Sequence, residues 1–350
     1  MKTYNNLYEK IYQFDNLHEA YLRARRGKRD RAEVLRFERD LEGELIQLQN
    51  ELIWDQYETG AYRTFHVFEP KVRLVAALPF RDRVVQHALI GTIEDIWERR
   101  FIHHSYACRP GRGMHMGANQ AQQWLREVQA THGRAYCLKA DVAKYFPSID
   151  HEVLMELLAK RISCKRTLKL CHDIMESWYP GLPIGNLTSQ LWANIYLHEL
   201  DTFVKQHIGA RRYIRYMDDF LIVHHDKAYL HGLRQVIEQW LWDRLRLKLN
   251  NKTQIFPVGI KHGRALDFLG YRMWTTHRRL RNDSVKRMDK KLKKLQTQFK
   301  DGLIDFSDVK QRVNSWLGHA SHADSYRIRR KLLGSAVFRR GEKLENTVSK

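Results

Sequence analysis

The chain has 350 residues, of which 61 are lysine or arginine and 40 are aspartate or glutamate, so its formal net charge is +21. Hydrophobic residues make up 43%, which is enough for a buried core, and the length predicts roughly two or three domains or subdomains. The positive charge favours a polyanionic partner, nucleic acid before an anionic membrane surface. No apolar run approaches the roughly 20 residues of a spanning helix, and the N-terminus lacks the apolar core of a signal peptide. We therefore expect a cytoplasmic protein without membrane insertion.

The N-terminal residues 1–60 are predicted to be helical, because Leu35, Leu41, Leu45, Leu48 and Leu52 recur at near-helical spacing. A basic cluster precedes these leucines, from Arg23 to Arg31. A solvated helix face and an RNA contact explain that cluster equally well.

Short strands and helices alternate after Tyr62. In chain order the expected elements up to the middle of the chain are strands Phe65–Phe68 and Val72–Val75, a helix from Asp82 to about Arg99, a helix around Ala118–Gln129 and a strand Ala135–Ala140 that ends at Asp141. Ser148 or Asp150 can cap the next helix, Glu152–Arg161.

The second half continues in the same way and ends in a basic region. The expected elements are a helix from about Thr188 to Gln206, strands Arg212–Arg215 and Phe220–Val223, a helix from about Ala228 to Leu245, and strands near Gln254–Pro257 and Leu266–Trp274. The last 70 or so residues are predicted to be helical. From His277 to Lys300 an apolar stripe is expected to face the core: Val285, Met288, Leu292, Leu295 and Phe299.

The segment Tyr216-Met217-Asp218-Asp219 joins two strand-like runs. Neighbouring carboxylates repel and raise each other's pKa, and a bound cation relieves that repulsion. An Asp-Asp pair is also common in ordinary β-turns, so the segment alone leaves a metal site and a simple turn open.

Asp141 ends a second strand-like run, and both runs are expected to be central strands of one sheet. Two-metal phosphoryl transfer places two Mg²⁺ ions about 3.5–4 Å apart, and these ions need carboxylate oxygens from separate elements. Asp141 with Asp218 and Asp219 supplies that set. Taken alone, Asp141 is explained as well by an N-cap-like aspartate at the end of a strand.

The flanking segments resemble the reverse transcriptases, block by block and in order, from Tyr62 to Trp274. The blocks are Lys71-Val72-Arg73, Asp141-Val142-Ala143-Lys144-Tyr145-Phe146, Gly181 to Gln190, Tyr216 to Asp219, Leu249 to Thr253, and Phe268-Leu269-Gly270-Tyr271. The resemblance implies an α+β right-hand polymerase with fingers, a palm of antiparallel sheet flanked by helices, and a helical thumb. We expect an N-terminal helical extension over 1–60, interleaved fingers and palm over 61–274, and a basic thumb over 275–350.

The same resemblance assigns roles to residues. Metal ions, two Mg²⁺ with Mn²⁺ as an alternative, fall to Asp141, Asp218, Asp219 and the backbone carbonyl of Val142. Lys71 and Arg73 are placed to hold the triphosphate of an incoming dNTP. Phe146, rather than its neighbour Tyr145, lies under the sugar. The remaining nucleotide and primer-grip positions are Ile184, Gly185, Gln190 and Lys252, and Gly270 and Tyr271, respectively.

The third block departs from most of the family, which has Gln-Gly and later Ser-Pro where this chain has Ile184-Gly185 and Ser189-Gln190. That pattern, with Tyr106-Ala107-Cys108-Arg109-Pro110-Gly111 upstream, resembles the reverse transcriptases of diversity-generating retroelements. These bacterial or phage enzymes copy a template-repeat RNA with errors opposite adenines. The resemblance implies the same reaction here, together with RNA–cDNA duplex binding and a small, basic, oligomeric accessory variability protein as partner.

Two alternatives remain open from the sequence. One is a group II intron-like or retron-like reverse transcriptase of ordinary fidelity, in which Ile184 and Gln190 are lineage drift. The other is a catalytically silent RNA-binding scaffold built on a palm fold, which the presence of all three carboxylates argues against.

Overall fold

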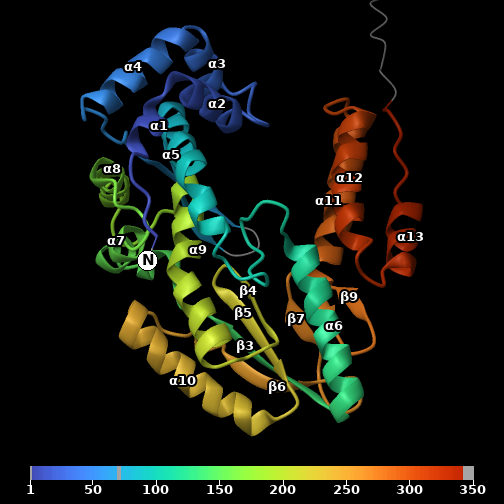
Figure 1. The fold of residues 1–350 in the computed structure, drawn as a ribbon. Coiled ribbons are helices and arrows are strands. Elements are labelled where there is room, and N and C mark those ends of the chain that lie inside the picture. Colours follow the sequence, from blue (N-terminus) through green and yellow to red (C-terminus); the bar gives the residue numbers. More distant parts are fainter. Residues whose placement is uncertain (1, 69–71, 342–350) are drawn as a thin grey trace, which may run out of the picture. The chain divides into compact units, whose positions relative to one another are not determined.

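The computed structural model describes residues 2–68 and 72–341, and Figure 1 shows its elements. It divides into two compact units, each treated by itself below. The first unit consists of the described parts of Met1–Gly113, Leu138–Ile222 and Ala228–Gln254, and the second consists of those of Met114–Cys137, Val223–Lys227 and Ile255–Lys350. Lys71, expected to contact a triphosphate, lies outside the described residues.

Helices dominate the first unit. They are α1 (Tyr8–Tyr12), α2 (Phe14–Ala24), α3 (Ala32–Glu38), α4 (Leu41–Ile53), α5 (Phe80–Glu98), α7 (His151–Ala159), α8 (Lys165–Glu176), α9 (Leu187–Thr202) and α10 (Lys227–Leu245), with a 3₁₀ turn at Phe146–Ser148 and a π-helical turn at Phe203–His207. The second unit contains α6 (Met114–His132), α11 (Asn282–Lys300), α12 (Phe306–Ala320) and α13 (Tyr326–Gly334). Within the described residues, no helix is both long and apolar enough to span a bilayer.

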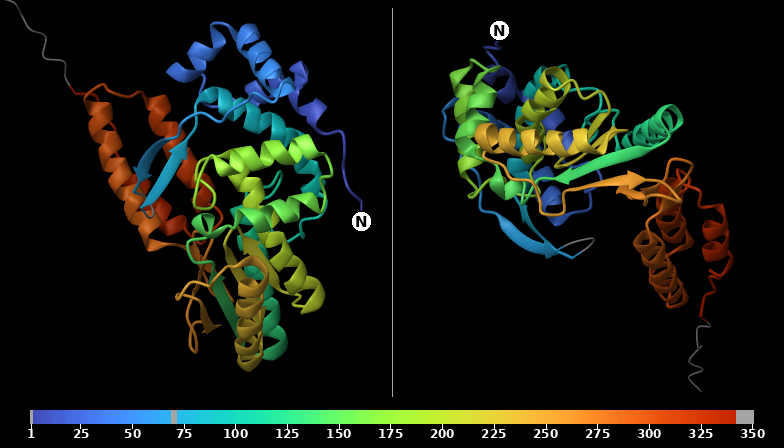
Figure 2. Two further views of the ribbon diagram at one scale, coloured as in Figure 1. Left: turned by 90° about the vertical axis from the view of Figure 1, so that its left-hand side faces the viewer. Right: turned by 90° about the horizontal axis from the view of Figure 1, so that it is seen from below.

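The strands form three sheets. β1 (Arg63–Val67) pairs with β2 (Arg73–Ala77), a second sheet has the order β4 (Tyr213–Tyr216), β5 (Asp219–His224), β3 (Ala135–Asp141), β6 (Gln254–Val258), and a third has the order β7 (Leu266–Phe268), β8 (Tyr271–Met273), β9 (Arg278–Leu280). β5 and β3 are therefore the central strands of the four-stranded sheet, as the sequence predicts. The view from below in Figure 2 shows α9 and α10 on the same side of β3.

Most of the expected helices form where the periodicity places them. α5, α6, α7, α9 and α10 match the predicted segments to within a few residues at most ends, and Asp150 is the cap of α7, since its carboxylate accepts the backbone N–H of Val153 at 3.1 Å. The N-terminal leucines divide: Leu45, Leu48 and Leu52 are fully buried, whereas Leu35 is 48% exposed. The break between α3 and α4 shifts the helical phase and puts Leu35 on the solvent side.

Two predictions near the C-terminal part are wrong. The expected strand Leu266–Trp274 is a hairpin of β7 and β8, because Leu269 and Gly270 both adopt positive φ, 49° and 84°, which an extended strand cannot contain. The helix expected from His277 begins only at Asn282, since β9 first pairs with β8. The sequence analysis also missed α8, whose N-cap residue, Cys164, makes no side-chain cap hydrogen bond.

The core of the first unit contains a fully buried ion pair between Arg215 of β4 and Asp201 of α9, whose side chains are both 0% exposed. The Arg215 guanidinium donates to both carboxylate oxygens, from Nε and from Nη2, at 2.7 Å each. The Tyr213 hydroxyl donates to the same carboxylate at 2.8 Å. Burial without such partners would strongly disfavour both charges, so the pair requires α9 and β4 to dock together.

Asp201→Asn is expected to lower the free energy of unfolding by about 3–5 kcal/mol, because it leaves the Arg215 charge buried and unpaired. Urea unfolding followed by circular dichroism measures this loss. The control is Lys160→Met, which breaks a partly exposed pair with Glu199 (45% and 34% exposed) and should cost at most about 1 kcal/mol. Equal midpoints for the two variants would contradict the prediction.

Candidate functional site

Asp141 and Asp218 lie side by side at the ends of neighbouring central strands. Asp141 is the last residue of β3, and Asp218 follows Met217 in the tight turn between β4 and β5, where Tyr216 pairs with Asp219. The backbone N–H of Val142 donates to the carbonyl of Asp218 at 3.3 Å. Strand pairing thus brings together two carboxylates that are far apart in the sequence.

The pKa of Asp218 is raised to about 6. Burial is the largest cause, and the charge of Asp141, together with a hydrogen bond between the two side chains, adds to it, while the positive charge of Arg73 on β2 opposes it. The pair is therefore electrostatically uncomfortable when both carboxylates are ionised. A cation bound between them would relieve that repulsion.

Asp219 takes a different partner. Its Oδ2 lies 3.8 Å from the Nζ of Lys139, and Lys139 shares a face of β3 with Asp141 because the two residues are separated by one. All three aspartates therefore belong to one region. Across the residues that the structure describes, no group of three or more His, Cys, Asp or Glu side chains is gathered closely enough to hold a metal ion.

The donor set still fits Mg²⁺ in its chemistry. Asp141 and Asp218 offer carboxylate oxygens, which are the ligands this hard cation prefers, and their mutual repulsion is what a divalent ion would neutralise. Asp219 would have to exchange its contact with Lys139 to join them. Val142 is buried, at 2% exposed, and is held beside Asp218 through its backbone.

Asn250 is a site residue that the sequence analysis missed. Its backbone N–H donates to the carbonyl of Asp141 at 2.7 Å, and its Nδ2 lies 3.4 Å from the Asp141 carboxylate. The signal was available, since Asn250 stands in the same block as Lys252, and the block as a whole is placed beside Asp141. Lys252 itself is exposed, and its N–H donates to the Asn250 side chain at 3.0 Å.

Ile184 and Gly185 attach the β1–β2 hairpin to the rest of the first unit. The N–H of Ala76 on β2 donates to the carbonyl of Ile184 at 2.8 Å. Gly185 has φ +135°, and a Cβ there would lie 2.3 Å from the Ala76 carbonyl oxygen. Only glycine allows this approach. Gln190 is exposed in the first turn of α9.

Tyr145 and Phe146 point to different environments. Tyr145 is buried, and its hydroxyl donates to the carbonyl of Ala193, which keeps it in the core. Phe146 is partly exposed, and its carbonyl accepts the N–H of Leu182 at 2.9 Å. The accessible ring is therefore that of Phe146, the residue expected under the sugar.

Gly270 and Tyr271 belong to the second unit. Gly270 lies in the β7–β8 turn, and the Tyr271 hydroxyl lies 2.9 Å from His115 Nδ1 and 2.9 Å from the carbonyl oxygen of His319. Arg278 stacks over the Tyr271 ring at 5.2 Å. The hydroxyl thus joins α6 to α12, and the turn beside it is held firmly.

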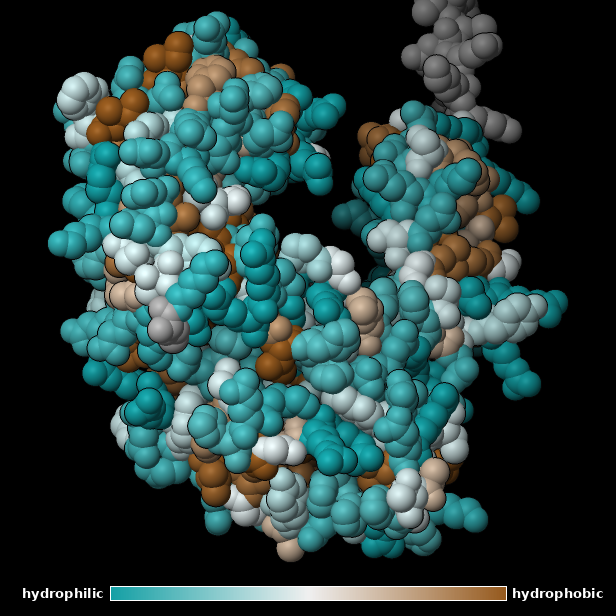
Figure 3. Space-filling model, in the orientation of Figure 1, coloured by the Kyte–Doolittle hydropathy of each residue, from teal (hydrophilic) through white to brown (hydrophobic). Residues whose placement is uncertain are grey.

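The second unit also carries a basic helix. Met288, Leu292 and Leu295 of α11 are buried, which confirms the core side of the predicted stripe, whereas Val285 and Phe299 are partly exposed. The exposed basic residues of α11 are Lys286, Arg287, Lys290, Lys291, Lys293, Lys294 and Lys300. Figure 3 shows a largely hydrophilic surface on the side it presents, as expected of a face that meets water or phosphates.

Gly185→Ala is expected to loosen the β1–β2 hairpin, because its methyl group would collide with the Ala76 carbonyl and would also be strained at that φ. Limited proteolysis should cut between β1 and β2 faster than in the unmodified protein. Gly232→Ala on α10 is the control, since no atom lies within 4 Å of the added methyl. Unchanged cleavage in Gly185→Ala would contradict the close approach.

Comparisons with known proteins agree with this geometry. Residues 68–273 match the family "Reverse transcriptase (RNA-dependent DNA polymerase)". The chain is 29% identical over 275 residues to Protein YkfC of Escherichia coli, covering 66% of this chain and 71% of YkfC. It is also 32% identical over 147 residues to the group II intron-encoded protein LtrA of Lactococcus lactis, covering 39% of this chain but only 23% of LtrA.

A solved structure supports the fold. Apo telomerase from Candida tropicalis superposes with a TM-score of 0.50 at 10% sequence identity, covering 65% of this chain and 49% of the telomerase chain. The expected polymerase fold, with an antiparallel sheet flanked by helices, is thereby confirmed. Since the family match spans more than half of the sequence, the chain belongs to the reverse transcriptase family and is similar to group II intron-encoded proteins.

Proposed function

We propose that this chain is an RNA-directed DNA polymerase that uses divalent metal ions. The observation that carries the proposal is the pairing of Asp141 with Asp218 on adjoining central strands, where burial and mutual repulsion raise the pKa of Asp218. That pair lies within the 68–273 match to the reverse transcriptases. In this proposal the segments 1–60, 61–274 and 275–350 serve as extension, fingers with palm, and thumb.

The residues of the chain divide the work. Asp141, Asp218 and Asp219, with the Val142 carbonyl, would hold two Mg²⁺ ions, which supply activation of the primer 3′-hydroxyl and charge neutralisation at the phosphates. Arg73 would hold the triphosphate, and Lys71 is assigned the same role from the sequence alone. The Phe146 ring would support the sugar, and Lys252 would neutralise the leaving pyrophosphate. Asn250 would keep the Asp141 carboxylate oriented through their hydrogen bond.

The finer proposal is that the enzyme is an error-prone polymerase of a diversity-generating retroelement. Its support is the Ile184-Gly185 and Ser189-Gln190 pattern. The backbone of Ile184 is held by Ala76, so the difference from most of the family lies in the side chain. An apolar side chain removes a hydrogen bond near the incoming nucleotide, worth about 0.5–1.5 kcal/mol, or up to roughly tenfold in discrimination.

The proposed partners follow from the same subgroup. They are a template RNA, its duplex with cDNA, dNTPs, and a small basic accessory variability protein. The strong positive charge suits the nucleic acids. A basic protein partner would need acidic contacts, which Glu42 and Glu44 in the first turn of α4 could offer.

A second candidate is a group II intron-like reverse transcriptase of ordinary fidelity. Its support is that LtrA, one of the similar proteins, is a group II intron-encoded protein. The two candidates share the carboxylate site and differ only in their errors. A catalytically silent scaffold would share the fold but extend no primer.

Asp141→Asn and Asp218→Asn are each expected to abolish Mg²⁺-dependent primer extension on an RNA template, because each removes a charge that holds the ion. Both should still bind RNA in a filter-binding assay. In EDTA, Asp218→Asn should melt no lower than the unmodified protein, since repulsion is gone, and it should lose the rise in Tm that Mg²⁺ gives the unmodified protein.

The matched control is Asp267→Asn, which changes an exposed aspartate paired with Arg281 in the second unit. It should keep both extension and the Mg²⁺ effect on Tm. Full extension by either active-site variant would end the two-metal proposal, and no extension by the unmodified protein would favour the scaffold.

Ile184→Gln is expected to lower misincorporation opposite template adenines by up to about tenfold, through the restored hydrogen bond. Sequencing of cDNA made on a defined template measures this rate, with Ile184→Leu as the apolar control. Unchanged adenine errors in Ile184→Gln would refute the proposed role, and low adenine errors in the unmodified protein would favour the ordinary-fidelity candidate.

A further inference from the structure

Arg215 is a buried arginine that stands immediately before the Tyr216-Met217-Asp218-Asp219 segment. Its side chain is 0% exposed, and it has no solvent contact through which to bind a substrate. Figure 1 shows β4 beside β5 in the four-stranded sheet. A charge so costly to bury, so close to the candidate carboxylates, calls for a physical explanation.

The guanidinium divides its hydrogen bonds into two sets. Nε and Nη2 bind the two carboxylate oxygens of Asp201 at 2.7 Å each, which fixes the plane of the fork. The remaining nitrogen, Nη1, donates to the Asn194 side chain at 3.0 Å and to the backbone carbonyl of Met217 at 3.1 Å. The ion pair therefore orients a donor towards the carboxylate-bearing turn.

The Met217 carbonyl belongs to a strained turn. Met217 has φ +54°, a left-handed conformation that methionine rarely adopts, and such strain persists only where the surroundings enforce it. The next residue is Asp218, so the peptide that Arg215 holds directly precedes the Asp218 side chain. A shift of this carbonyl would rotate the Asp218 carboxylate relative to Asp141.

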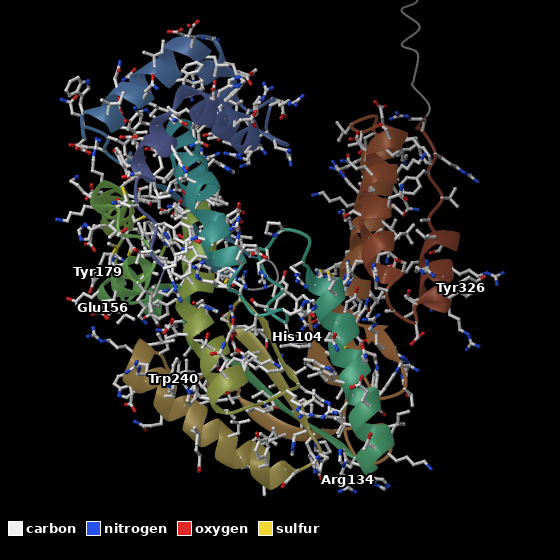
Figure 4. The ribbon with its side chains drawn as sticks, in the orientation of Figure 1. His104, Arg134, Glu156, Tyr179, Trp240 and Tyr326 are labelled. Carbon is white, nitrogen blue, oxygen red and sulfur yellow. The ribbon has the colours of Figure 1, made fainter. Side chains whose placement is uncertain are left out.

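The same residues tie in a segment that the candidate site does not use. The N–H of Arg215 donates to the His104 carbonyl at 3.0 Å, and the N–H of Tyr106 donates to the Arg215 carbonyl at 3.1 Å. Asn194 donates to the Ala107 carbonyl at 2.9 Å. His104 is labelled in Figure 4. The Tyr106-Ala107-Cys108 motif thus borders β4 on the side away from β5.

We propose that Arg215 is a positioning residue, which sets the Met217–Asp218 peptide so that Asp218 meets Asp141 in the geometry needed for metal-dependent catalysis. Asp201 holds the guanidinium in place, and Asn194 connects it to the 104–107 segment. This inference rests on the proposed function. It goes beyond the carboxylates, because it assigns to a buried arginine the geometry of the turn.

A purely structural role would predict something different. If Arg215 acted only as a partner of Asp201, any loss from the Asp201 network of similar size would affect catalysis similarly. Tyr213 provides that comparison, since its hydroxyl binds the same Asp201 oxygen at 2.8 Å but makes no contact with the Met217 carbonyl.

The test compares Arg215→Lys with Tyr213→Phe. Lysine keeps the charge opposite Asp201 but lacks the fork that reaches Met217. For Arg215→Lys we expect kcat for primer extension to fall about 10- to 100-fold and the Mg²⁺ midpoint to rise by a similar factor, with KM for dNTP changed less than about threefold. Tyr213→Phe should stay within about threefold of the unmodified enzyme in each quantity, although it is less stable.

A second readout is independent of catalysis. Hydrogen exchange should increase in the Met217–Asp219 turn of Arg215→Lys and should stay unchanged there in Tyr213→Phe. If Arg215→Lys does not fold, Asn194→Ala, which leaves the ion pair intact, should show the same changes to a smaller degree. Equal exchange in the turn and equal Mg²⁺ midpoints for the arginine and tyrosine variants would overturn the positioning role. Failure of the unmodified enzyme to extend a primer would instead refute the proposed function, and the exchange comparison would still decide the inference.

Discussion

The buried pair of Arg215 and Asp201 is the interaction on which the first unit depends. Neither charge is exposed, so each must remain paired, and the pairing fixes α9 against β4. Through Nη1 of Arg215 the same pair reaches the turn that carries Asp218. One buried contact therefore links the packing of a helix to the position of a carboxylate.

The carboxylates impose a second, opposing constraint. Strand pairing brings Asp141 and Asp218 close enough to raise the pKa of Asp218, which costs stability at neutral pH when no cation is bound. The fold bears this cost through neighbours such as Arg73, whose charge opposes the shift. Sites that concentrate like charge in this way are typical of functional centres, because a bound ligand supplies the missing counter-charge.

The contact between Gly185 and Ala76 explains how the nucleotide-binding residues are assembled from separate parts of the chain. It fastens β2, with Arg73, to the segment that contains Ile184. The backbone there is fixed by sterics, which leaves the Ile184 side chain as the variable element. The chemistry of the site and its proposed selectivity thus rest on different physical terms, electrostatics for the former and side-chain hydrogen bonding for the latter.

The sequence by itself determined the long amphipathic helices, the β4–β5 hairpin with its aspartates, and the ordered blocks, because these depend on local periodicity and on motif spacing. It did not reveal α8, the β7–β8 turn at Leu269, or the contact of Asn250 with Asp141. Nor did it show that Arg215 is buried, since an arginine in a strand is ordinarily exposed. Only the tertiary structure decided these points, because each depends on which distant segment lies alongside, and burial turns such a neighbour into an obligatory partner.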